Sequence, residues 1–143
     1  MKHVFNSLNQ LYYLIYTLII LMTISGYFLN MNSLLTISVD ESTAYSLLII
    51  HGIVSILALV YYVYFFVNKG KFKSIENTKV REIKFLNSGK IRLFLIGISL
   101  FIGVIALYLV RSDIPLYFLA VSGLLLLISK PVEVKIEEIL SDN

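Results

Sequence analysis

The sequence predicts an all-α integral membrane protein, a four-helix up-and-down bundle that forms one domain over residues 1–143. The first observation is composition: 58% of the residues are hydrophobic and only 15% are charged, whereas soluble domains carry about 25% charged residues. The second is a set of four long stretches without a charged residue, each close to the roughly 20 apolar residues that a spanning helix needs. A mean hydropathy of +0.85 agrees with both.

The predicted helices cover residues 11–29, 46–67, 93–110 and 114–129. The first is interpreted as an uncleaved helix, because its apolar run is longer than a signal-peptide core and no clear small-residue cleavage site follows it. The fourth is short for a span, but the flexible side chain of Lys130 directly after it can extend to the headgroups. A re-entrant fourth segment is the alternative.

Charges between these stretches predict the orientation. Residues 68–92 form a basic loop with eight Lys and Arg residues and two Glu, whereas residues 30–43 hold two acidic residues and no basic one. Because basic loops stay in the cytoplasm, four crossings place both termini there, in a multi-pass protein of the cell membrane with a short cytoplasmic tail over 130–143. The predicted membrane-surface residues are Lys69, Lys71, Lys73, Lys79, Arg81, Lys84, Lys90 and Arg92.

His51 is the one residue of the predicted spans that can carry a charge near neutral pH. Polar groups at that depth are costly and are therefore candidates for function. One interpretation is an axial ligand of haem b or a hydrogen-bonding partner of a quinone. The other is a neutral imidazole that is hydrogen-bonded to a neighbouring helix or lies near the headgroups. His3, next to Lys2, is expected to be solvated.

Small residues indicate where helices approach one another. Ser99 and Gly103 form a small-xxx-small pair on the third predicted helix. Such residues allow close packing around a cofactor, and ordinary contact between helices is the alternative. The predicted helix-packing residues are Gly26, Gly52, Ser55, Ser99, Gly103 and Gly123.

Several kinds of chemistry are excluded by composition. The chain has no cysteine, which removes disulfides, thiolate catalysis, cysteine-ligated zinc and iron–sulfur clusters, and its two histidines are too few for a His-rich metal site. No nucleophile–base pair, carboxylate pair or phosphate-binding loop is present in the sequence. We therefore expect neither an enzyme nor a nucleic-acid-binding protein. The expected partners are the lipid bilayer and other membrane protein subunits, or a second copy of the chain.

The stretch from Lys79 to Val110 resembles the beginning of the third helix in the four-helix membrane b-type cytochrome subunits of formate dehydrogenases and hydrogenases. That family has a K-Y-N-x-x-Q-K type signature there, which this chain echoes with one extra residue and without the Gln. His51 also falls on the second helix, where the family has a haem ligand. The residues that echo the signature are Lys84, Phe85, Asn87, Gly89 and Lys90.

The chain departs from this family at the other haem ligands. Tyr12 lies near the position of the expected histidine on the first helix, and the fourth helix has no histidine. The resemblance therefore implies a reduced relative, a non-catalytic membrane subunit or scaffold that holds one haem b through His51 or none. The alternative is a bacteriocin-immunity-type protein or another membrane binding protein without a cofactor.

Overall fold

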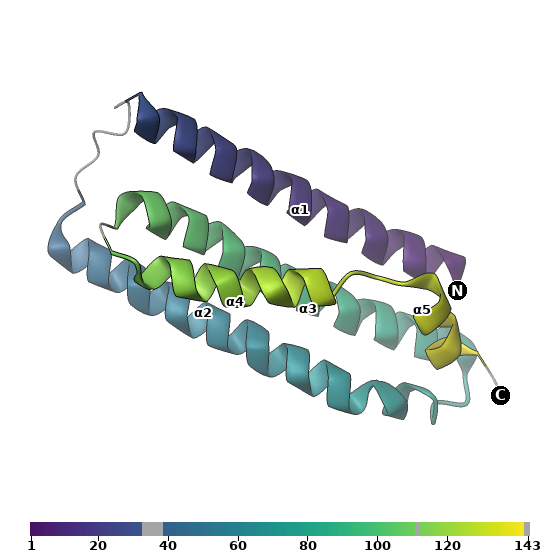
Figure 1. The fold of residues 1–143 in the computed structure, drawn as a ribbon. Helices are drawn as coiled ribbons and strands as arrows, with labels where there is room; N and C mark the ends of the chain where they lie inside the picture. The colour runs from purple at the N-terminus through teal and green to yellow at the C-terminus, as the bar shows by residue number, and fades with distance from the viewer. Residues whose placement is uncertain (33–38, 111, 142–143) are drawn as a thin grey trace.

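The computed structural model describes residues 1–32, 39–110 and 112–141, and every regular element in these ranges is helical. Successive long helices run in opposite directions, so that α1 begins and α5 ends at the same end of the molecule (Figure 1). We call this the terminal end. The elements are α1 (Lys2–Met31), α2 (Glu41–Asn68), the short 3-10 helix η1 (Lys69–Phe72), α3 (Thr78–Leu109), α4 (Ile114–Ile128) and α5 (Glu133–Leu140).

Three helical segments are long and apolar enough to cross a membrane: α1, α2 continued by η1, and α3. α4 and α5 meet the same criterion only as a pair, and the chain bends by 68° between them. The described residues thus contain three candidate spans, or four if the bent pair is one span, in agreement with a membrane protein. α4 closely matches the predicted short helix 114–129.

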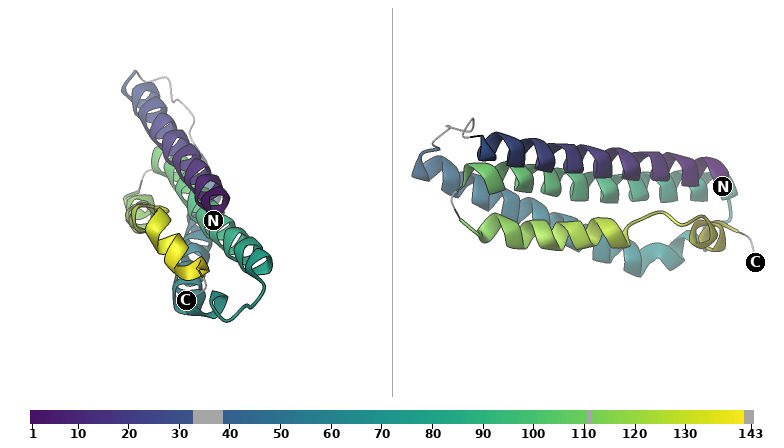
Figure 2. Two further views of the ribbon diagram at one scale, coloured as in Figure 1. Left: turned by 90° about the vertical axis from the view of Figure 1, so that its right-hand side faces the viewer. Right: turned by 45° about the horizontal axis from the view of Figure 1, so that its top comes forward.

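α3 is the central helix of the molecule. It contacts α1, α2 and α4, whereas α1 contacts only α3 and α5 among the described elements. Figure 2 shows α1 lying along α3 at one side of the other helices. α3 accordingly supplies more of the enclosed apolar side chains than any other helix, including Leu93 and Ile96, which are fully buried.

Glycines bring α1 and α3 close together. A β-carbon on Gly89 would lie 2.9 Å from Cδ2 of Leu8, and one on Gly97 would lie 3.1 Å from Cδ1 of Ile15. At the other end of the pair, the ring of Tyr108 from α3 lies against Gly26 of α1. Small residues of this kind let two helix backbones approach in a membrane, where van der Waals contact drives association.

Two helices are longer than predicted, and the basic loop is correspondingly shorter. α1 begins at Lys2 rather than at residue 11, and α3 begins at Thr78 rather than at 93, so the prediction of a loop over 68–92 is wrong for its second half. The side chain of Asn77 accepts a hydrogen bond of 3.2 Å from the backbone N–H of Val80 and caps α3 there. Hydropathy detects only the apolar part of a helix, and both helices continue beyond it as amphipathic segments.

The C-terminal segment is also corrected. The sequence predicts a short tail over 130–143, but α5 packs against the other helices through Ile136 and Leu140, which are 5% and 0% exposed. These two side chains lie one helical turn apart and face the same side. Residues 142–143 lie outside the described residues.

Candidate functional site

His51 lies in a fully enclosed position among three helices. α2 directs the side chain toward α3 and α4, where it is 0% exposed. Its ring meets Phe118 of α4 edge-on, with centroids 5.4 Å apart, and its Nε2 lies 2.7 Å from the place that a β-carbon on Gly103 would occupy. We call His51, Gly103 and Phe118 the His51 layer. A side chain at position 103 would overlap the imidazole as it is placed here, so the ring would have to shift to admit one.

Neither ring nitrogen of His51 has a hydrogen-bond partner among the described residues, and neither is accessible to water. A buried polar atom without a partner costs about 1–3 kcal/mol, so this imidazole is an exception that calls for an explanation. It is not hydrogen-bonded to a neighbouring helix as one sequence interpretation expected.

The space around His51 bears on its predicted role as an axial ligand of haem b. An axial bond needs an open space in front of one ring nitrogen, but here both nitrogens are enclosed, and Nε2 faces the backbone of Gly103. Cδ2 of Leu119 comes as near as Nε2 to the β-carbon position of residue 103, at 2.7 Å, and closes the same space. The second histidine, His3, is exposed at the start of α1, so the two histidines of the chain do not converge.

A chain of three serine hydroxyls lies one helical turn from the His51 layer. Ser99 Oγ of α3 is 2.7 Å from Ser55 Oγ of α2 and 2.7 Å from Ser122 Oγ of α4. All three side chains are buried. A hydroxyl both donates and accepts, so each oxygen of this serine chain has a hydrogen-bond partner, and the chain joins α2, α3 and α4. Ser122 directly precedes the predicted packing residue Gly123 in the sequence.

The other three predicted packing residues, Gly26, Gly52 and Gly123, have different surroundings. A β-carbon on Gly52 would lie 3.5 Å from the ring of Phe118, an ordinary contact. Gly26 lies in the α1–α3 contact, away from the serine chain, and nothing lies within 4 Å of a β-carbon on Gly123. The structure therefore gathers Ser55, Ser99 and Gly103 around one site, places Gly52 beside it against Phe118, and leaves Gly26 and Gly123 outside it.

The predicted membrane-surface residues divide into lysines and arginines. The lysines at positions 69, 71, 73, 79, 84 and 90 are exposed. Arg81, by contrast, is only 3% exposed, which corrects its assignment to the surface. It donates through Nε and Nη2 to the carbonyl of Ile75 at 2.9 and 2.7 Å, and through Nη1 to the carbonyl of Leu140 at 2.9 Å. Arg81 thus ties the turn before α3 to the end of α5.

The assignment of Arg92 to the membrane surface is also corrected, because this residue is half-buried between helices. Its guanidinium carbon lies 4.3 Å from the ring centroid of Phe65, and Nη2 lies 3.4 Å from the carbonyl oxygen of Ser129. Counting charges along a segment cannot distinguish these arginines from the neighbouring lysines. The difference is the face of α3 on which each residue lies.

An ion pair that the sequence did not indicate holds the start of the chain. The amino group of Met1 lies 2.8 Å from Oε1 of Glu82, which places the N-terminus of α1 against α3. Both groups are partly exposed, and such surface pairs contribute at most about 1 kcal/mol. The pair therefore orients α1 more than it stabilises the fold.

Comparison with protein-family models, with curated proteins and with solved structures finds no match to this chain. The interpretation of the site therefore depends on its own geometry: an enclosed imidazole, a serine chain that joins three helices, and near the terminal end one buried arginine, Arg81, and one half-buried arginine, Arg92.

Proposed function

We propose that this chain is a small multi-pass protein of the cell membrane and serves as a non-catalytic subunit or scaffold. In this proposal α1, α2, α3 and the bent α4–α5 pair cross the bilayer in up-and-down order, as a four-helix bundle with both termini in the cytoplasm. The charges support this orientation. Lys69, Lys73 and Lys79 lie around the α2–α3 turn, whereas Asp40 and Glu41 lie at the opposite end of α2, and basic segments stay inside.

The observation that carries the proposal is the position of α1. Among the described elements, α1 contacts neither α2 nor α4 and is held mainly by α3. Leu14, Leu18 and Leu21 are 58%, 51% and 55% exposed. Their spacing of four and three residues places them in one stripe along the helix, the spacing that pairs helices in coiled coils. This stripe is available to lipid or to a helix of another membrane subunit.

The unit formed by α2, α3 and α4 suits the role of a support. The serine chain links all three helices with mutual hydrogen bonds, and hydroxyls of this kind bind helices together in lipid. A rigid three-helix unit with a fourth helix at its side can hold a partner helix against α1 without rearranging its own core.

We propose further that the chain is a relative of the membrane b-type cytochrome subunits that binds no haem. The enclosure of His51 supports the haem-free form, since neither ring nitrogen is accessible. An absorption spectrum of detergent-purified protein tests this point. We expect no Soret band, and a Soret band that disappears in His51→Ala would contradict it.

Site-specific photo-crosslinking in the native membrane tests the subunit role. A photoreactive residue is placed at Leu14, Leu18 or Leu21, and matched controls are placed at Ile53 and Ile56 of α2, which are 54% and 57% exposed. We expect the α1 positions to give an adduct with one membrane protein and the α2 positions to give adducts with lipid alone. Lipid adducts from all five positions would overturn the proposal.

A further inference from the structure

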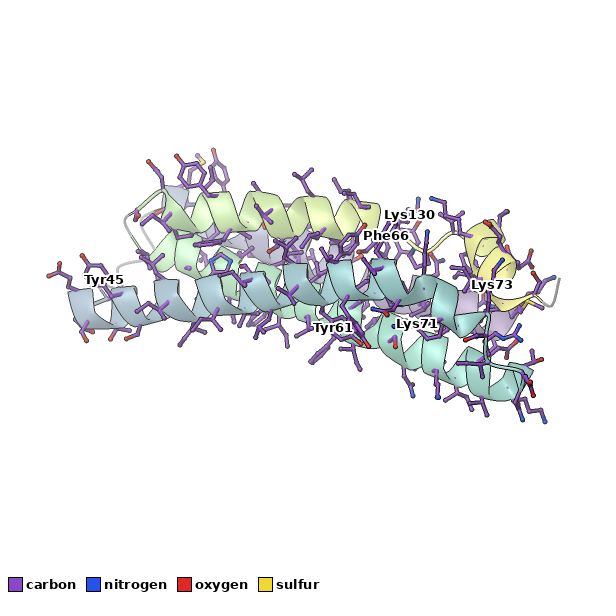
Figure 3. The ribbon with its side chains drawn as sticks, turned by 90° about the horizontal axis from the view of Figure 1, so that it is seen from below. Tyr45, Tyr61, Phe66, Lys71, Lys73 and Lys130 are labelled. Atoms are coloured by element: carbon purple, nitrogen blue, oxygen red, sulfur yellow. The ribbon has the colours of Figure 1, made fainter. Side chains whose placement is uncertain are left out.

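A cavity of about 480 Å³ opens at the terminal end of the molecule, where the chain bends between α4 and α5. Its walls come from the end of α2, from η1, from the α4–α5 connection and from α5, with Arg92 of α3 among the lining residues. In Figure 3, Lys130 and Phe66 lie near each other at the end of α4, and Lys73 lies beside α5. We call this cavity the terminal pocket.

Positive charge dominates the terminal pocket. Five basic side chains line it against a single acidic one, Glu138. None of the five forms an ion pair within the described part of the chain. The basic residues are Lys69, Lys73, Arg92, Lys130 and Lys135.

Arg92 and Ser129 give the pocket a polar base with unused hydrogen-bonding capacity. Within the described residues, Nε of Arg92 and Oγ of Ser129 have no hydrogen-bond partner, and both atoms are buried. Arg92 stacks on Phe65 with its guanidinium carbon 4.3 Å from the ring centroid, which fixes the cation in place. A half-buried guanidinium without a counter-ion is unfavourable, and an anion in the pocket would compensate its charge.

One side of the terminal pocket is apolar and continues onto the exposed apolar surface of the helices. Phe66, Ile128 and Val132 line it and are 56%, 65% and 41% exposed. A soluble anion would gain nothing from this wall. An amphiphile would place its charged group between the basic residues and its acyl chains along these side chains.

We propose that the terminal pocket binds the phosphate of an anionic phospholipid headgroup. Guanidinium and ammonium groups are the side chains that proteins use for phosphate, and basic pockets between spanning helices bind anionic lipid headgroups. Inorganic phosphate has the same recognition chemistry, but it would leave the apolar wall unused. This inference does not depend on a subunit partner at α1.

Native mass spectrometry of the delipidated protein in non-ionic detergent tests the inference by titration with phosphatidylglycerol or phosphatidylcholine. The pocket variant is Arg92→Gln with Lys130→Gln. The control is Lys79→Gln with Lys90→Gln, which removes the same charge from exposed lysines of α3 outside the pocket. Far-UV circular dichroism checks the helix content of both variants. A second pocket variant, Lys69→Gln with Lys73→Gln, changes only exposed side chains.

Wild type and control should bind phosphatidylglycerol in preference to phosphatidylcholine, and each pocket variant should bind it about thirtyfold more weakly, since each charge near an anionic lipid is worth about fivefold. Equal binding of the two lipids, or equal losses in control and pocket variants, would overturn the proposal. If millimolar inorganic phosphate displaced phosphatidylglycerol from wild type, the lipid source would be wrong.

Discussion

The imidazole of His51 occupies the space that a side chain on Gly103 would fill, with Nε2 only 2.7 Å from the position of a β-carbon. The two residues come from different helices, α2 and α3, and the presence of each explains why the other is found at its position. Without glycine at 103 the enclosed ring would have no room, and without the ring a glycine in the middle of α3 would leave an empty space. This contact sets how closely α2 and α3 approach.

Gly103→Ala should therefore destabilise the protein. The new methyl group would meet both Nε2 of His51 and Cδ2 of Leu119 at 2.7 Å, and overpacking of this kind typically costs about 1–3 kcal/mol. The free energy of unfolding, measured by titration of dodecyl sulfate into detergent-solubilised protein, reports the loss. His51→Ala in the same chain should recover part of it, because Leu119 still crowds the site.

Gly123→Ala is the matched control for this experiment. Nothing lies within 4 Å of a β-carbon at that position of α4, so the methyl group has space. Alanine is favoured over glycine within a helix by about 0.8–1 kcal/mol, and the control should be neutral or stabilising. Equal destabilisation by the two substitutions would show that contact with His51 is not the cause.

Ser99→Ala should loosen the contact among α2, α3 and α4. It removes two hydrogen bonds at once, to Ser55 and to Ser122, and leaves both of those hydroxyls with one partner fewer. Hydrogen bonds between membrane helices average about 0.6 kcal/mol, so the expected loss of unfolding free energy is about 1 kcal/mol. Ser46→Ala is the control, because that exposed hydroxyl bonds only to the carbonyl of Ser42 in its own helix. A loss no larger than that of the control would rule out a structural role for the serine chain.

Arg81→Gln should release α5 from the rest of the molecule. The substitution removes the charged donors that reach the carbonyls of Ile75 and Leu140, and hydrogen bonds of charged groups contribute about 1.5–3 kcal/mol. Amide hydrogen exchange should become faster over α5 and stay unchanged in the middle of α3. Lys84→Gln, an exposed position about one turn further along α3, should leave α5 protected. Unchanged exchange in the Arg81 variant would contradict this anchoring role.

The cap of α2 should depend on pH. The hydroxyl of Thr43 donates to Asp40 at 2.6 Å and its backbone N–H donates at 3.2 Å, and these bonds hold the pKa of the Asp40 carboxyl below its ordinary value of 3.8. A lowered pKa in the folded state means that the cap stabilises the helix fully above the unfolded pKa and is lost as the pH falls through the folded one.

The amide chemical shift of Thr43 measures this titration directly. The midpoint of its shift should lie below pH 3.8, and Asp40→Asn should remove the transition while keeping the cap. A midpoint at or above 3.8 would show that the carboxylate is not hydrogen-bonded in solution.

Hydropathy predicted the apolar parts of the helices but not their ends. On α1 the buried residues Val4, Leu8 and Tyr12 recur at intervals of four, which is a helical period that begins well before the apolar run. Arg81, Phe85 and Gly89 show the same interval on α3. A buried arginine and a glycine do not register as hydrophobic, so hydropathy alone places the start of a helix too late. The periodicity was the signal that could have found both segments.

The sequence identified individual residues of the candidate site, but it did not predict that they would lie together. His51, Ser55, Ser99 and Gly103 each stand out in the sequence because polar and small residues are unusual in apolar helices. Their meeting in two adjacent layers depends on how far α2 is shifted along α3, and that shift is set by interhelical contacts between residues far apart in the chain. The basic terminal pocket could not be predicted from the sequence for the same reason, since its lysines come from η1 and the residue after it, from the α4–α5 connection and from α5.

The number of membrane crossings can be measured directly, and the proposed orientation of the chain requires four of them. The chain has no native cysteine, so single cysteines at Glu41, Lys73, Asp113 and Ser141 can be probed in intact cells with a membrane-impermeant maleimide. If the chain crosses four times, Glu41→Cys and Asp113→Cys should be labelled from outside. Lys73→Cys and Ser141→Cys should be labelled only after the membrane is permeabilised. Labelling of Ser141→Cys in intact cells would place the C-terminal helix outside and contradict the four-span arrangement.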